Sequence, residues 1–226
     1  MFPESFTFSI ADWVNGWVDA LVTHYGDVFR HISDTLLWAI VNLEGLLRMA
    51  PWWLMLAIVG GIAWHATRKL LTTAVIVGLL FLVGAVGLWD KLMQTLALML
   101  VATLISVLIG IPLGILSARS NRLRSVLMPL LDIMQTMPSF VYLIPVLMLF
   151  GLGKVPAIFA TVIYAAPPLI RLTDLGIRQV DGEVMEAINA FGANRWQQLF
   201  GVQLPLALPS ICLLYTSDAA DDTPCV

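Results

Sequence analysis

Hydrophobic residues fill most of the chain in long runs, and short polar or charged segments separate these runs. A helix rises about 1.5 Å per residue, so a run of about 20 apolar residues crosses the roughly 30 Å hydrocarbon core of a bilayer. We expect five membrane-spanning helices, over residues 51–67, 70–88, 92–117, 126–150 and 155–172. The pattern therefore predicts an all-α, polytopic membrane protein.

The first fifty residues show a different pattern. In residues 10–32 the apolar positions recur every three or four residues, with acidic residues on the other faces, which is typical of an amphipathic helix. Such a helix could lie on a membrane surface or contact a neighbouring subunit, and an ordinary packing helix fits the pattern equally well. Residues 36–47 contain Asn42 and Glu44 and are too short and polar to span, so we expect an interfacial elbow there. Residues 1–50 then form an N-terminal region that precedes the spans.

The composition supports a membrane protein and gives no sign of an enzyme. Hydrophobic residues make up 59% of the 226 residues and charged residues 12%, about half the usual charged share of a soluble domain. No nucleotide-binding Gly-rich loop, nucleophile motif or basic nucleic-acid patch is present. The three histidines lack metal-ligand spacing, and both cysteines lie in the last fifteen residues. We expect no catalytic residue, no metal and no cofactor on this chain.

Basic residues are unevenly divided between the two sides of the predicted spans. Alternate loops lie on the same side, and eight of the twelve lysines and arginines fall on one side: Arg68, Lys69, Arg119, Arg122, Arg124, Arg171, Arg178 and Arg195. The other four are Arg30, Arg48, Lys91 and Lys154. Because cytoplasmic loops carry the excess of basic residues, we expect an external N-terminus and a cytoplasmic loop after the fifth span.

The fourth and fifth predicted spans contain several prolines. Pro129, Pro138 and Pro145 should interrupt the fourth span, and Pro167-Pro168 should break the end of the fifth, because proline removes a backbone donor and clashes with the preceding turn. Broken helices often line a pathway, although membrane helices also tolerate proline for other reasons.

A mildly polar face accompanies the prolines of the fourth span. An acidic residue within a span is a functional candidate, but Asp132 could also stay near the cytoplasmic interface, paired or hydrated. The candidate pathway-lining residues are Asp132, Gln135, Pro138, Tyr142 and Pro145.

A polar segment, residues 175–204, follows the fifth span. A short helix should end at Gly192, because glycine adopts the left-handed conformation without steric cost. Residues 194–200 can form a second short helix, with Trp196, Leu199 and Phe200 as its apolar face. A pair of short helices fits a groove on another protein, so we expect this segment to dock a cytoplasmic partner.

The segment resembles the permease subunits of binding-protein-dependent ABC importers. Their signature is Glu-Ala-Ala, three residues, Gly, nine residues, Ile-x-Leu-Pro. The matching residues are Glu186, Ala187, Gly192, Leu204 and Pro205, while Ile188 and Val202 replace an alanine and an isoleucine. The resemblance implies that Glu186, Ala187, Gly192, Trp196, Leu204 and Pro205 couple the spans to an ATPase. It also implies a type I ABC importer permease fold.

Further segments are similar to the glycine betaine/proline (quaternary amine) permeases. These are residues 135–145, 150–156, 166–173 and 176–180. The resemblance covers nearly the whole chain up to Ile211. It implies a homodimer of two permease copies in the bacterial inner membrane, cytoplasmic ATPases that bind ATP and Mg²⁺, and an external solute-binding protein.

The last fifteen residues depart from this resemblance. Residues 51–211 are expected to be the transmembrane permease domain, including the start of a sixth span. Residues 212–226 contain three acids and both cysteines where a helix should enter the bilayer. We therefore expect a C-terminally truncated chain with a non-native tail, with a genuine short tail as the alternative.

The leading interpretation is the transmembrane subunit of an ATP-driven importer for glycine betaine, proline betaine or a related compatible solute. An importer permease for another small solute, such as an amino acid, is the nearest alternative. A secondary transporter or channel that works without ATP, and a scaffold without transport, are the alternatives from other classes.

Overall fold

A computed structural model describes residues 10–212, and these residues form only helices and the turns between them. The tail expected at residues 212–226 lies outside the described residues except for Cys212, the last residue of the last helix. The chain divides into two compact units, the first formed by residues 10–101 and 145–158 and the second by residues 102–144 and 159–212.

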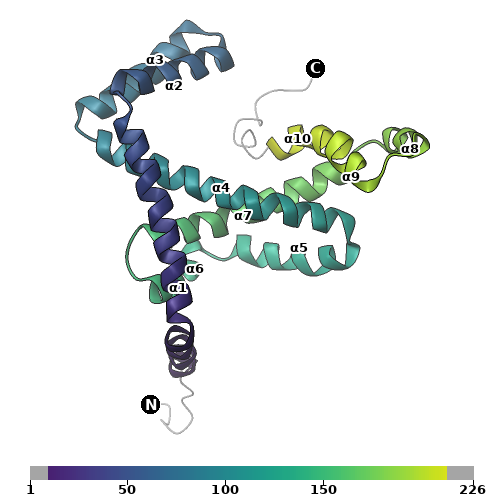
Figure 1. Cartoon of the computed structure of the whole chain (residues 1–226), viewed down its shortest axis with the longest axis horizontal. Helices are drawn as coiled ribbons and strands as arrows, with labels where there is room; N and C mark the ends of the chain where they lie inside the picture. Colours follow the sequence, from purple (N-terminus) through teal and green to yellow (C-terminus); the bar gives the residue numbers. More distant parts are fainter. Residues whose placement is uncertain (1–9, 213–226) are drawn as a thin grey trace, which may run out of the picture. The chain divides into compact units, whose positions relative to one another are not determined.

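The first unit contains the N-terminal helices. They are α1 (Ile10–Met49), α2 (Trp52–Thr67), α3 (Leu70–Ala85) and the first part of α4 (Trp89–Arg119). The α2 and α3 helices form an antiparallel hairpin (Figure 1), joined by Arg68 and Lys69. Arg68 ends α2 in the left-handed conformation, with φ of 52°. The rings of Trp52 and Phe81 lie 6.4 Å apart and join the start of α2 to the end of α3.

A charged cluster joins α1 to the starts of α4 and α7 within the first unit. Glu44 is buried and accepts from Lys154 at 2.5 Å and from Arg48 at 2.8 Å. Arg48 also lies 3.8 Å from Asp90. Since a buried carboxylate is stable only when it is paired, these cations fix the end of α1.

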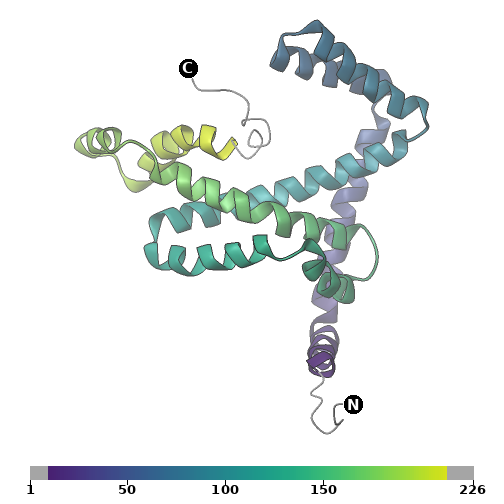
Figure 2. The same cartoon turned by 180° about the vertical axis from the view of Figure 1, so that it is seen from behind.

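The second unit contains the remaining helices. They are α5 (Asn121–Thr136), the first part of α6 (Ser139–Phe150), most of α7 (Lys154–Arg178), α8 (Gly182–Ala190), α9 (Arg195–Gln198), the π-helix η2 (Leu199–Gln203) and α10 (Leu204–Cys212). In both views α7 runs beside α5 and beside the second half of α4 (Figures 1 and 2).

Two apolar clusters hold the second unit together. In the first, Leu169 and Ile177 of α7 pack with Leu199, Ala207 and Ile211, and partly buried residues of α4 cover them. The second cluster joins α5 to α7 through Leu131, Ala166 and Ile170. The helices that precede the polar segment are thus packed directly against the elements that follow it.

Four of the predicted spans each fall largely within one helix, whereas the fourth, residues 126–150, divides between α5 and α6. By length and composition, α4 and α7 can each cross a membrane alone. The end of α1 with α2, and α5 with α6, can each form one further span if the bent pair is counted together, with bends of 96° and 94°. The α3 helix is apolar but shorter. The described residues therefore contain up to four such spans, and the expected number of five stays a prediction.

The expected elbow at residues 36–47 is wrong, because α1 runs without a break from Ile10 to Met49. Asn42 did not end the helix: its side chain donates to the carbonyl oxygen of Trp38. The sharp bend comes later, at Ala50 and Pro51. Most side chains of residues 10–22 lie outside the description, so the expected amphipathic face there is not tested.

The proline predictions hold at one position only. The fourth span breaks at Pro138, between α5 and α6, whereas Pro129 and Pro145 lie inside continuous helices. The fifth span is not broken by Pro167-Pro168, because α7 continues to Arg178. Pro167 is fully buried, and packing from neighbouring helices stabilises a helix that contains proline.

Candidate functional site

The polar segment begins later than expected, because α7 continues past Leu175. Helix α8 starts at Gly182, where the Asp181 carboxylate caps it by accepting from the N–H of Glu183 at 2.9 Å. The helix ends at Ala190, and Gly192 adopts a φ of 75°. Left-handed backbone of this kind favours glycine, so the prediction that the first short helix ends at Gly192 is confirmed.

A reciprocal cap begins helix α9. The side-chain oxygen of Asn194 accepts from the N–H groups of Trp196 and Gln197, at 3.0 and 2.9 Å, and Gln197 accepts from the Asn194 N–H at 2.9 Å. This is a capping box. Gln198 then donates to Asn189 of α8 at 2.7 Å. The two short helices are therefore held to each other by specific polar contacts.

The segment returns to the apolar core through a π-helix. Leu199 is fully buried in the cluster that includes Leu169 and Ile177 of α7. The N–H of Leu204 donates to the carbonyl oxygen of Leu199, which gives the wider π spacing. Pro205, which has no N–H, follows directly. The second helix predicted over residues 194–200 is thus shorter, and its last turn belongs to η2.

Large apolar side chains are exposed along the segment that contains α8, α9 and η2. Phe191 is 91% exposed and Trp196 is 66% exposed. The ring of Trp196 stacks on that of Phe200, with centroids 5.7 Å apart and planes 7° from parallel. Glu186 is exposed on α8. We call Glu186, Phe191, Trp196 and Phe200 the coupling surface, after the role that the resemblance in sequence predicts for this segment.

The structure brings most of the predicted coupling residues into this segment but gives them different environments. Glu186, Ala187 and Trp196 are exposed, and Gly192 forms the turn. Leu204 instead packs against the apolar core, and the exposed Pro205 lies at the start of α10. The signature therefore contains both residues that can contact a partner and residues that fix the shape of the segment.

Asp132, the acidic candidate of the fourth span, forms an ion pair with Arg171 of α7. Its side chain remains 61% exposed, and Gln135 on the next turn is also exposed. Arg171, which we counted with the cytoplasmic loop, lies within α7. The alternative that Asp132 is paired therefore agrees with the structure.

Tyr142 has a structural contact at the break between α5 and α6. Its hydroxyl donates to the carbonyl oxygen of Met134 at 2.5 Å. In an α-helix this carbonyl would accept from residue 138, but Pro138 has no N–H. Tyr142 therefore supplies the donor that the proline removes. Pro138 and Pro145 are exposed.

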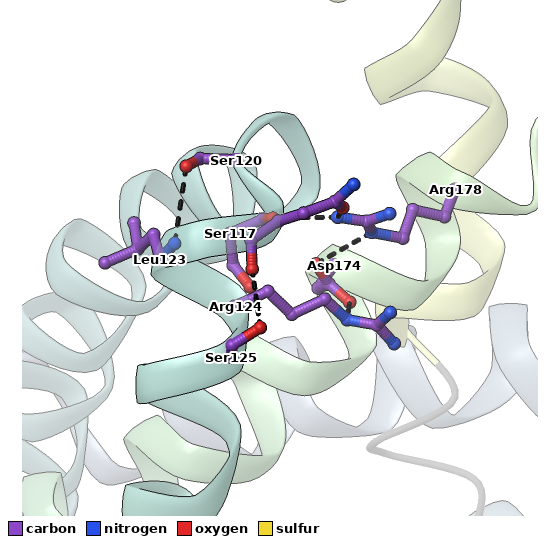
Figure 3. Close-up of polar contacts among 8 residues, drawn as sticks. Ser117, Ser120, Leu123, Arg124, Ser125, Asp174 and Arg178 are labelled. Atoms are coloured by element: carbon purple, nitrogen blue, oxygen red, sulfur yellow. Dashed lines mark hydrogen bonds and ion pairs between the residues drawn. The ribbon is translucent and has the colours of Figure 1, made fainter.

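The sequence did not single out a buried carboxylate at the end of α7. Asp174 is 1% exposed and contacts Arg178 of its own helix and Arg124 of α5 (Figure 3). We call these three residues the Asp174 cluster. The spacing of Asp174 and Arg178, one helical turn, was the signal available in the sequence. Across residues 10–212 no three His, Cys, Asp or Glu side chains gather in a way that could hold a metal ion.

Comparison with known proteins identifies the family. Residues 110–219 match the family described as binding-protein-dependent transport system inner membrane component. The chain is 42% identical over 209 residues to the glycine betaine/carnitine transport permease protein GbuB of Listeria monocytogenes, covering 91% of this chain and 73% of that protein. The chain belongs to the permease family of binding-protein-dependent ABC importers.

Two further permeases are similar over almost the same region. The glycine betaine/proline betaine transport system permease protein ProW of Escherichia coli is 45% identical over 199 residues, which is 88% of this chain and 56% of that protein. The glycine betaine transport system permease protein OpuAB of Bacillus subtilis is 39% identical over 202 residues, which is 89% of this chain and 71% of that protein. The chain thus spans little more than half the length of the E. coli relative.

Membership of this permease family confirms several expectations. The chain is an all-α, multi-pass component of a bacterial inner membrane with the fold of a type I importer permease. The relatives are named permease proteins of transport systems, which confirms the expected non-enzymatic role of the chain as a transporter subunit. The coupling surface lies within the matched region.

Proposed function

We propose that this permease is the membrane-spanning subunit of an ATP-driven importer for glycine betaine, proline betaine or a related quaternary-ammonium solute. The names of the relatives support this solute class, since three of them at 39–45% identity carry glycine betaine in their names. The resemblance noted in residues 135–145 and 166–173 points the same way.

The coupling surface is the main structural support for coupling between this permease and an ATPase. Short helices with exposed aromatic residues fit a groove on another protein, and Trp is enriched where partners bind most tightly. We assign this surface to a cytoplasmic ATPase, which binds ATP and Mg²⁺. Closure of two ATPases on two permease copies would move the α8–α9 pair and change access to a central pathway.

The remaining parts of the importer follow from this assignment. The excess of basic residues on the side of α8 and α9 supports a cytoplasmic coupling surface and an external N-terminus. A solute-binding protein would deliver the solute from outside. Solute selection would then rest largely on that protein, where aromatic rings can hold a quaternary ammonium by cation–π contacts.

Uptake measurements test this function directly. The complete permease should be expressed with its ATPase and binding protein in cells that lack their own osmolyte uptake, and radiolabelled glycine betaine should be compared with methionine. We expect betaine accumulation that is lost with a hydrolysis-deficient ATPase. Betaine uptake no higher than that of cells without the permease, or preferred uptake of methionine, would contradict the assignment.

The Glu186→Lys variant separates an ATP-driven permease from a carrier that needs no ATPase. Reversing an exposed charge at a protein interface disfavours binding of the partner, so we expect uptake to fall by about tenfold or more. The amount of permease in the membrane should be measured in parallel. Unchanged uptake at equal abundance would indicate a self-sufficient carrier.

A further inference from the structure

Asp174 is a fully buried carboxylate shared by two arginines at the end of α7. Its Oδ1 atom lies 3.2 Å from Nε of Arg178, and its Oδ2 atom lies 3.2 Å from Nε of Arg124. The side chain of Arg178 is 29% exposed and that of Arg124 is 45% exposed. A carboxylate in such a place is costly unless its partners hold it, so the two cations are tightly linked to the position of Asp174.

The arginine of α7 extends the cluster to two more helices. Arg178 donates through Nη2 to the carbonyl oxygen of Ser117, near the end of α4, at 3.1 Å, and to Oδ1 of Asn121, the first residue of α5, at 2.9 Å. Figure 3 shows Arg178 and Arg124 on either side of Asp174, with Ser117 beside them. The end of α4, the start of α5 and the end of α7 thus meet at one set of polar contacts.

A neighbouring contact connects these helix ends to the coupling surface. Arg119, the last residue of α4, donates to the carbonyl oxygen of Arg195, the first residue of α9, at 3.0 Å. On the other side, only residues 179–181 separate the end of α7 from the start of α8. The α8–α9 pair is therefore tied to α4 by a hydrogen bond and to α7 by a short connection.

The backbones of α4 and α7 pack closely, which holds the two helices in one relative position. A Cβ atom added at Gly114 would lie 2.5 Å from Cβ of Thr173 and 2.8 Å from the carbonyl oxygen of Ile170. One added at Gly110 would lie 2.8 Å from a methyl carbon of Leu169. Small residues four apart let helices approach closely in membranes, so we expect α4 and α7 to move together.

We propose that the Asp174 cluster makes the ends of α4, α5 and α7 move as one body with α8 and α9, so that a displacement of the coupling surface reaches the spans. Asp174 is then a positioning residue for coupling and contacts neither solute nor ATPase. The inference rests on the proposed function, since it needs a partner that displaces α8 and α9.

The chemistry of the cluster favours this role over simple stabilisation. Replacing a buried ion pair by apolar side chains is often neutral or stabilising, so a pair of this kind is weak evidence for stability, and in some proteins such pairs serve to specify one arrangement. Here the Asp174 carboxylate holds the start of α5 to the end of α7, and its partner Arg178 holds the end of α4 to them. We expect that loss of these contacts lets the end of α4, the start of α5 and the end of α7 move independently, while the helices themselves stay folded.

The experiment measures coupling in the complete importer reconstituted in liposomes. The readouts are co-purification of the ATPase, ATP hydrolysis and solute uptake, and the decisive quantity is ATP hydrolysed per solute transported. We expect Asp174→Asn to raise this ratio by about tenfold, and Arg124→Gln by about threefold, because Arg178 still holds the carboxylate in the second variant. Hydrolysis itself should stay within about twofold of the wild type, since the ATPase subunit is unchanged.

Two matched variants serve as controls. Arg122→Gln removes an exposed arginine from the same turn of α5, where it makes no ion pair with any described residue. Ser117→Ala removes a buried hydroxyl that has no hydrogen-bond partner in the described chain, but keeps the carbonyl oxygen that Arg178 uses. Both should couple as the wild type does. The double variant Asp174→Asn/Arg124→Gln should be no worse than Asp174→Asn alone, because both changes remove the same interaction.

The outcomes separate this inference from the proposed function. Raised ratios in Asp174→Asn and Arg124→Gln with normal controls support the inference. If Asp174→Asn fails to assemble, Arg124→Gln decides, and a ratio equal to that of Arg122→Gln would overturn the inference. A wild-type importer without solute uptake would overturn the proposed function and this inference with it.

Discussion

The hydroxyl of Tyr142 donates to the carbonyl oxygen of Met134 at 2.5 Å, across the break between α5 and α6. This carbonyl has lost its usual helical donor because Pro138 stands four residues later. A side chain from the next helix therefore compensates for the proline, and the sharp bend of the fourth span is built into the sequence by two residues.

Removing this hydroxyl should destabilise the bend. In Tyr142→Phe the Met134 carbonyl loses its donor, which costs about 1–3 kcal/mol for a polar group away from water. The thermal unfolding temperature of the purified permease in detergent should fall accordingly. The matched control is Tyr164→Phe, because the ring of Tyr164 is exposed. Equal unfolding temperatures for the two variants would contradict the compensation.

A second prediction concerns the contact between α4 and α7. Gly114→Ala places a methyl group 2.5 Å from Cβ of Thr173, so one of the helices must shift, at a cost of about 1–3 kcal/mol. Gly78→Ala, in α3, is the control, because an added Cβ there meets no atom within 4 Å. Unfolding in detergent should separate the two variants. A stable Gly114→Ala protein would show that the helices are not locked at this point.

The capping box of α9 gives a third, local prediction. Asn194→Ala removes the acceptor for two N–H groups, a change that costs about 0.5–2 kcal/mol at a helix N-cap. Amide hydrogen exchange of Trp196 and Gln197 should become faster while exchange in α7 is unchanged. Asn42→Ala is the control, since the Asn42 side chain bonds only within α1 among the contacts described. Unchanged exchange at Trp196 would argue against the cap.

The sequence predicted those parts of the fold that depend on local pattern. The apolar runs located α2 and α3 almost residue by residue, and Gly192 marked the end of α8 because its backbone conformation is a local property. Residues 36–47 were interpreted wrongly, because polar residues such as Asn42 can bond back to their own helix.

The sequence did not predict the contacts between residues that lie far apart in the chain. Asp132 and Arg171 are 39 residues apart, and Arg178 bonds to Ser117 across 61 residues. The sequence also did not show which prolines break a helix: Pro138 does, whereas the buried Pro167 and the exposed Pro129 and Pro145 lie within helices. The sequence predicted one apolar face of Trp196, Leu199 and Phe200, but only the structure shows that Leu199 is buried while the two aromatic residues are exposed.

Photo-crosslinking tests most directly whether the coupling surface docks the ATPase. A photoreactive phenylalanine analogue should be placed at Trp196, which is 66% exposed, and in a separate variant at Leu152, which is 94% exposed in a loop expected on the external side. In membranes that contain the complete importer, illumination should link the ATPase to position 196 and never to position 152. Crosslinks to the ATPase from position 152, or none from position 196 in an importer that transports, would contradict the account.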